Sequence, residues 1–232
     1  MKCLIKTMVV CLAVFFFCGQ AMAEDRIPVY LGAKLGLSMM TADDVDNSTD
    51  VANKAAVNKS EEDDTLTALG LAVGYDWGKS FDVPVRTELE YMYRTDFNYS
   101  ADPTFTNAAV PTKVDIDMNV QTLLFNAYLD IDTGTPFTPY IGAGLGWAFL
   151  ESKGDVTVLA TGAEDSEDNQ ETNLAWNVGA GVAYAFDENW SADLGYRYLD
   201  CGSMEWGDTN QLGLKADEIT AHELLLGIRY TF

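Results

Sequence analysis

Apolar and polar residues alternate along the last stretch of the chain. One set of alternate positions is apolar and extends to the final residue, whereas the positions between them include charged residues and a glycine. A period of two residues predicts a β-strand whose two faces meet different surroundings. The apolar set is Leu224, Leu226, Ile228, Tyr230 and Phe232, and the other set includes Glu223, Gly227 and Arg229.

The same alternation recurs in seven earlier segments. They are residues 29–39, 69–77, 85–94, 123–130, 140–149, 176–186 and 192–198. Upstream of Thr122 the alternation blurs. Long polar stretches at residues 41–64, 98–115, 151–172 and 199–217 alternate with short turn-like ones at 78–82, 132–136 and 187–189. Eight strands joined by alternating long loops and short turns are typical of an antiparallel up-and-down β-barrel that spans a membrane.

The first 23 residues have the pattern of a cleavable signal peptide. Lys2 and Lys6 precede an apolar run over residues 8–18, and Ala21 and Ala23 fit the small residues of a cleavage site. We therefore expect residues 1–23 to be removed and residues 24–232 to form one barrel domain. No later apolar run approaches the 18 residues that a membrane helix needs. An exported chain that crosses a membrane without helices must do so as a closed barrel.

A soluble up-and-down barrel is the main alternative fold, and it would reverse the two faces of every strand. Glycines such as Gly142, Gly144 and Gly179 lie on the face opposite the large apolar residues. Glycine weakens a strand, so it is better explained where a narrow barrel interior needs small side chains. Aromatic residues gather near the strand ends, for example Trp77, Trp147 and Tyr230. Such placement is typical of aromatic belts at membrane interfaces. The sequence thus favours an all-β transmembrane barrel with apolar residues facing lipid.

Three motifs and the signal peptide together resemble one known family. The motifs lie at residues 137–146 (FTPYIGAGLG), 194–198 (LGYRY) and 222–232 (HELLLGIRYTF). The whole mature chain is similar to the opacity-type, OmpA-like outer-membrane β-barrel family, which is porin-like in fold. The resemblance implies a bacterial outer-membrane location and contact with lipid and lipopolysaccharide. It also implies that the barrel-assembly machinery reads Ile228, Tyr230 and Phe232 as an assembly signal. Family members are mostly structural surface proteins, adhesins or weak pores.

Charges of both signs fall on the face that we assign to the barrel lumen. An ion path and an interior salt-bridge network that plugs the lumen are both consistent with this pattern. Buried charges must pair or stay hydrated, and side chains can fill an eight-stranded interior, so we favour the plug. The predicted lumen network consists of Lys34, Arg86, Glu88, Glu90, Arg94, Asp193, Arg197, Glu223 and Arg229.

The sequence offers few residues in a pattern that suits catalysis or metal binding. His222 is the only histidine, and its position in the alternation places it on the lipid face near the outer rim, so we expect no enzymatic activity. Of the four cysteines, three lie in the predicted signal peptide, and we expect Cys201 to be a lone thiol at a strand edge. The acidic loops lack the spacing of an EF-hand. We therefore predict no metal site and no cofactor.

The chain is strongly acidic, with a formal net charge of −22. This charge argues against nucleic-acid binding. The four long stretches hold 21 of the 36 acidic residues, and their length and polarity suit a surface exposed to the cell exterior. Two functions remain open: a surface protein whose loops meet a host or envelope ligand, and a narrow pore that acidic loops would make cation-selective.

Overall fold

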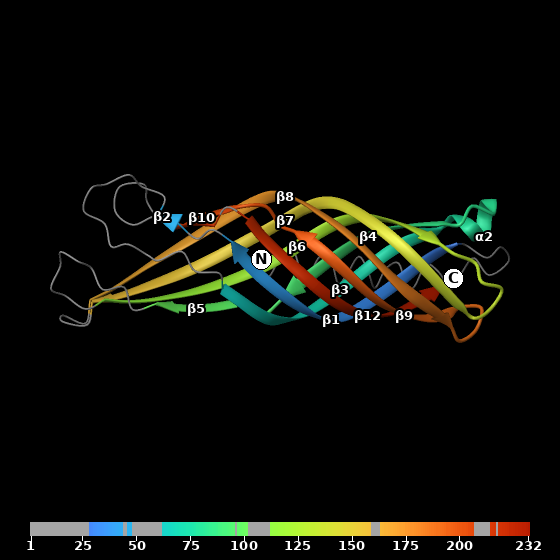
Figure 1. Cartoon of the computed structure of the whole chain (residues 1–232), viewed down its shortest axis with the longest axis horizontal. Coiled ribbons are helices and arrows are strands. Elements are labelled where there is room, and N and C mark those ends of the chain that lie inside the picture. Colours follow the sequence, from blue (N-terminus) through green and yellow to red (C-terminus); the bar gives the residue numbers. More distant parts are fainter. Residues whose placement is uncertain are drawn as a thin grey trace.

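The computed structural model describes residues 28–43, 46–47, 62–95, 97–101, 112–158, 163–206, 214–216 and 218–232. Eight antiparallel strands form a closed barrel (Figure 1), which confirms the predicted fold class. These strands are β1 (Val29–Asp43), β3 (Glu62–Asp76), β4 (Val85–Arg94), β6 (Thr112–Asp130), β7 (Phe137–Val158), β8 (Ala163–Ala185), β9 (Trp190–Asp200) and β12 (Glu218–Thr231).

Each of these eight strands pairs with the next one in the list, and one further pairing, between the first and the last strand, closes the ring. β1 pairs with β12, from Tyr30 opposite Thr231 to Asp43 opposite Glu218, and β4 pairs with β6. The smaller elements are β2 (Asp46–Asn47), α2 (Trp77–Phe81), β5 (Phe97–Ala101), β10 (Met204–Trp206) and β11 (Leu214–Ala216). No helix among the described residues is long and apolar enough to cross a membrane.

The three short connections lie at one end of the barrel together with the C-terminus (Figure 1). In the first, the Asp76 side chain caps α2 by accepting a hydrogen bond from the Gly78 N–H. In the third, the Asp187 carboxylate accepts hydrogen bonds from the N–H groups of Asn189 and Trp190. Local side-chain bonds of this kind allow tight turns between strands. We call this the short-turn end, and the opposite one the long-loop end.

At the long-loop end the structure corrects two of the predicted loops. In the loop predicted at residues 98–115, residues 98–101 belong to β5 and residues 112–115 to β6. Most of residues 151–172 belong to a long hairpin of β7 and β8, paired as far as Val158 opposite Ala163. The hairpin, with β6 paired to β7 as far as Thr112 opposite Val158, projects past the remaining strands (Figure 1). The prediction failed because it required an apolar face. Outside a membrane, backbone pairing alone can continue a ladder whose side chains are polar on both faces.

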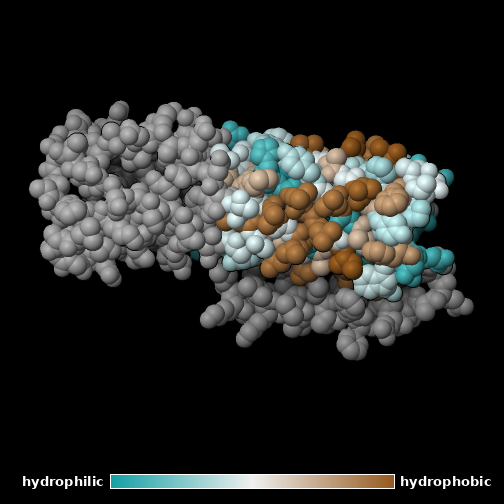
Figure 2. Space-filling view, turned by 60° about the horizontal axis from the view of Figure 1, so that its bottom comes forward, coloured by the Kyte–Doolittle hydropathy of each residue, from teal (hydrophilic) through white to brown (hydrophobic). Residues whose placement is uncertain are grey.

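The outward face of the barrel carries a continuous apolar band. Large apolar side chains there are about half exposed, including Leu35, Leu89 and Leu226. Figure 2 shows them gathered in a patch across the strands, with more polar residues at the short-turn end. On β9, Trp190 and Tyr198 lie eight residues apart, and on β12 so do Tyr230 and His222. At about 3.3 Å per residue and a tilt of about 40°, this spacing corresponds to roughly 20 Å of apolar height, close to the band of a membrane barrel.

Residues 1–27 lie outside the described residues. The signal peptide, its cleavage motif at Ala21 and Ala23 and the domain boundary at residue 24 therefore remain predictions.

Candidate functional site

The barrel interior is the candidate site, and strand alternation delivers its side chains. On β4 the even positions, among them Arg86, Glu88 and Arg94, are buried, whereas Leu89 between them is 45% exposed on the outside. Because adjacent side chains on a strand point to opposite faces, a single strand supplies both the lipid face and the interior.

Six of the predicted lumen residues form one chain of alternating charge. The Glu223 carboxylate accepts hydrogen bonds from Arg94 Nε at 2.7 Å and Arg197 Nε at 2.5 Å. Arg197 Nη1 also reaches Glu90 at 2.6 Å. Lys34 Nζ then joins Glu90 to Glu88, at 2.5 Å to each carboxylate. Four strands (β1, β4, β9 and β12) contribute to this chain, so it ties together residues that are more than 100 positions apart in the sequence.

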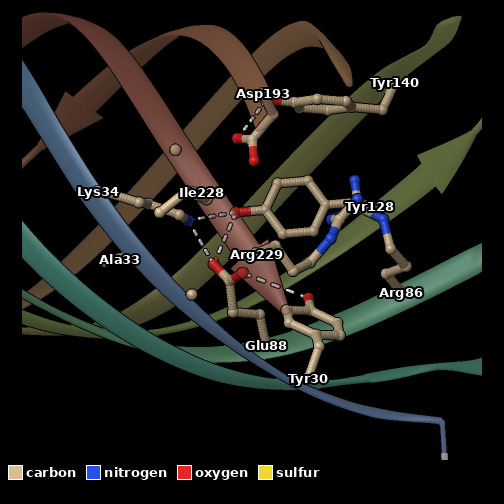
Figure 3. Close-up of a pocket in the computed structure, with 12 residues that line it drawn as sticks. Tyr30, Ala33, Lys34, Arg86, Glu88, Tyr128, Tyr140, Asp193, Ile228 and Arg229 are labelled. Carbon is tan, nitrogen blue, oxygen red and sulfur yellow. Dashed lines mark hydrogen bonds and ion pairs between the residues drawn. The ribbon is translucent and has the colours of Figure 1, made fainter. Parts of the chain in front are cut away.

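Tyrosine hydroxyls complete this network toward the short-turn end (Figure 3). Tyr128 donates to Glu88 at 3.1 Å, and Tyr30 donates to the same carboxylate at 3.3 Å. Arg86 forms a separate pair with Asp130, through Nε at 2.5 Å and Nη2 at 2.9 Å. The Arg86 guanidinium also lies 5.0 Å from the centre of the Tyr128 ring, within cation–π range.

Two other predicted members, Asp193 and Arg229, form no ion pair with a described residue. Asp193 accepts only a long hydrogen bond of 3.4 Å from Tyr140, and Arg229 donates to Ser191 at 3.0 Å. Within the described part of the chain, neither has an opposite charge at ion-pair distance. Both line a cavity of about 20 Å³ next to Lys34, and a second cavity of about 30 Å³ adjoins it. Such volumes hold individual water molecules and no larger solute.

The inward charges of this layer balance. Its five cations are Lys34, Arg86, Arg94, Arg197 and Arg229, and its five acids are Glu88, Glu90, Asp130, Asp193 and Glu223. A lumen built to select ions would present an excess of one sign. Here the charges sum to zero, and the eight that form ion pairs fill the interior and hold the strands together.

Catalytic chemistry does not converge on this interior. His222 lies on the outer face, where its Nδ1 is 2.7 Å from the Tyr196 hydroxyl. Among the described residues, no group of three or more histidine, cysteine, aspartate or glutamate side chains is placed to hold a metal ion.

The long-loop half of the interior is apolar, which the sequence analysis did not foresee. We call this layer the apolar septum, and each of its members is at most 5% exposed. It consists of Met40, Leu66, Val120, Leu124, Ala148, Leu150, Ala175, Leu199, Cys201, Ile219 and Ala221. Cys201, the free thiol that directly follows the last residue of β9, is buried in this septum.

Near the septum, the same alternate positions still face inward and outward, but the polarity of the two faces is exchanged. On β12, Leu224 and Leu226 face outward on the apolar band, but further toward the long loops Ile219 faces inward and Glu218 outward. On β6, Phe125 faces outward, whereas Val120 is buried inside and Gln121 takes the outward position. Polar outside and apolar inside is the arrangement of a protein surrounded by water. The strands thus leave the apolar surroundings at about this level.

Several interior residues were missed by sequence reasoning. Asp130, Tyr128 and Tyr140 lie on the inward parity of β6 and β7, and that parity alone could have identified them. The septum also left a signal in the sequence, because the alternation blurs upstream of Thr122, where its sense reverses.

Comparisons with known proteins agree with this architecture. Residues 9–232 match the family model described as the outer membrane protein beta-barrel domain. Outer membrane protein PagN of Salmonella typhimurium strain LT2 is 28% identical over 237 residues, covering 96% of this chain and 98% of PagN. A putative adhesin of Rickettsia bellii strain OSU 85-389 is 28% identical over 120 residues, covering 48% of this chain and 53% of the adhesin. The crystal structure of Neisserial surface protein A (NspA) aligns with a TM-score of 0.47 at 18% identity, covering 90% of this chain and all of NspA.

Proposed function

The chain belongs to the outer membrane protein beta-barrel family, and on that premise we propose that it is a non-enzymatic surface protein with a closed barrel and ligand-binding loops. Its location is the bacterial outer membrane, where its apolar band faces lipid. Relatives over all or part of the chain are named as outer membrane proteins and adhesins. The long-loop end is then the extracellular end, and the short-turn end is periplasmic.

The filled interior is the main observation in support of a barrel whose lumen has no open channel. Six charges pair in sequence from Arg94 to Glu88, and above them the septum leaves almost no exposed surface. The alternative, a narrow cation-selective pore, needs a continuous water path, whereas the two cavities each hold room for little more than one water. Planar-bilayer recording of the purified protein tests this part. We expect no stable channels at moderate voltage, and long-lived open states would favour the pore.

The charge of the loops indicates the kind of ligand. The four long stretches contain 21 acidic residues but only five lysines and no arginine. An acidic surface attracts cationic partners and repels polyanions, and both effects weaken as salt screens them. We therefore infer that the host or envelope ligand is a basic protein surface or peptide. A sulfated polysaccharide would have to overcome the repulsion.

Binding to cells that display the protein tests the ligand class. We expect a fluorescent lysine-rich peptide to bind more strongly to these cells than to cells that lack the protein. We also expect this binding to weaken as the salt concentration increases. Replacing Asp43, Asp44, Asp46 and Asp50 with asparagine should reduce it while leaving the amount of folded barrel unchanged. Preferential binding of heparin, unaffected by these substitutions, would contradict the inferred ligand class.

Assembly and lipid contacts form the second part of the proposal. We propose that the assembly machinery recognises Ile228, Tyr230 and Phe232, and that lipopolysaccharide surrounds the outer rim. The Tyr230 ring packs between Trp190, at 4.9 Å between centroids, and Phe232, at 5.1 Å. Deleting Phe232 should lower the outer-membrane level of the protein. An unchanged level in fractionated cells would remove this role.

A further inference from the structure

The septum and the charged layer are two different seals stacked along one lumen. Septum residues such as Val120, Leu150 and Leu199 have no exposed surface. The charged layer is equally closed next to the septum, at Arg94 and Glu223, but it is looser toward the short-turn end. There Lys34 and Asp193 border the two cavities, and Asp130 retains 19% exposure of its side chain. Water can therefore enter the charged layer, but the septum offers it no polar partner.

The septum lies at the outer edge of the membrane. Three aromatic side chains on the outer face mark this level, because the polar atom of each one forms a hydrogen bond with a polar side chain. Trp176 Nε1 donates to Asp200 at 3.0 Å, Tyr198 donates to Glu218 at 3.4 Å, and Tyr196 pairs with His222. Leu199 and Ala221 are the inward neighbours of Tyr198 and His222, so the septum begins where the aromatic belt ends.

Ionic strength and charge substitutions act differently on the two seals. A network of ion pairs can open locally when one partner is lost, because water then solvates the partner that remains. An apolar constriction excludes ions without any pairing, because ions must shed their hydration to enter it and water itself withdraws. The septum needs no help from the charged layer to stay dry.

We propose that the apolar septum is the permeability barrier of this barrel and that the charged layer beneath it is a hydrated dead end. This inference rests on the proposed closed barrel and adds which layer closes it. It predicts that breaking the charged layer alone exposes more of the lumen to the periplasmic side without opening a path through the protein.

The native Cys201 in the septum and an introduced cysteine in the charged layer test the proposal together. In the Arg86→Cys variant, a small cationic methanethiosulfonate reagent should modify residue 86. It should modify Cys201 more slowly by an order of magnitude or more. Peptide mass spectrometry assigns each adduct, and heat-modifiable migration on gels selects folded protein. The same variant should stay silent in planar bilayers.

A septum variant supplies the matched comparison. Leu150→Ser/Leu199→Ser should make Cys201 reactive, and combining it with Arg86→Cys should produce steady current. Rapid labelling of Cys201 or steady current in Arg86→Cys alone would overturn the septum as the barrier. A cysteine at position 86 that fails to react, or a combined variant that gives no current, would also overturn the septum as the barrier. Current through the unmodified protein is a separate outcome, which would instead refute the closed barrel itself.

Discussion

Glu223→Gln is the most direct test of the charged layer. The Glu223 side chain is fully buried and accepts one charged hydrogen bond from Arg94 and one from Arg197. Glutamine has nearly the same shape, but it carries no charge, and its amide N–H₂ group would face one of the two guanidinium donors. Two charge-assisted hydrogen bonds are worth about 1.5–3 kcal/mol each, and breaking a buried ion pair costs about 3–5 kcal/mol. We expect a loss of unfolding free energy of about 3–5 kcal/mol.

Glu218→Gln is the control for this experiment. Glu218 lies on the same strand but faces outward and accepts one long hydrogen bond from Tyr198. Its replacement should change stability by less than about 0.5 kcal/mol. Reversible urea unfolding in thin lipid bilayers, followed by tryptophan fluorescence, measures both variants. A loss below about 1 kcal/mol for Glu223→Gln, similar to that of an exposed pair, would refute the claim that Glu223 and its two arginines are buried and mutually dependent.

Three further predictions concern the lipid face, the interior and a turn. Leu89→Arg should cost about 2–4 kcal/mol in the same unfolding assay, because it places a charge in lipid; a loss no larger than that of Leu89→Val would mean that the faces are reversed. Gly146→Ala should impair folding, since its Cβ would lie 2.0 Å from a backbone oxygen of β6, whereas the Cβ of Gly32→Ala would meet ordinary contacts at 3.6 Å; equal refolding yields would contradict this. The backbone N–H groups of Trp190 and Asn189 lower the pKa of Asp187, so its contribution to stability is present above its ordinary pKa and is lost as pH falls through the lowered value. Asp187→Asn should flatten the acid side of the stability profile, and an unchanged slope would show that the turn carboxylate contributes nothing.

Strand alternation made much of this protein predictable from its sequence. A period of two residues assigns each side chain to one of two faces, and hairpin order then fixes which strands are neighbours. Residues such as Leu89 and Glu90 were therefore separated correctly into lipid-facing and inward-facing sets. The inward parity also selected Lys34 and Arg197 before any contact between them was known.

The sequence could not say which inward charges meet. Glu90 contacts both Lys34 on β1 and Arg197 on β9, and that depends on the relative shift of the strands around the closed ring. Alternation carries no information about this shift, because every register that preserves parity keeps the same faces. Asp193 lines an interior cavity, yet it lies beyond ion-pair distance of any described cation.

The sequence by itself determined an outer-membrane barrel with eight strands, because lipid imposes an apolar outer face on every strand that crosses it. Only the tertiary structure decided how the interior is divided. Val120 and Leu199 are far apart in the chain and carry no sign of a shared role, but closure of the ring brings them into one septum. The physical reason is that inward side chains choose their neighbours across the lumen, where packing and charge pairing act between strands that no local pattern connects.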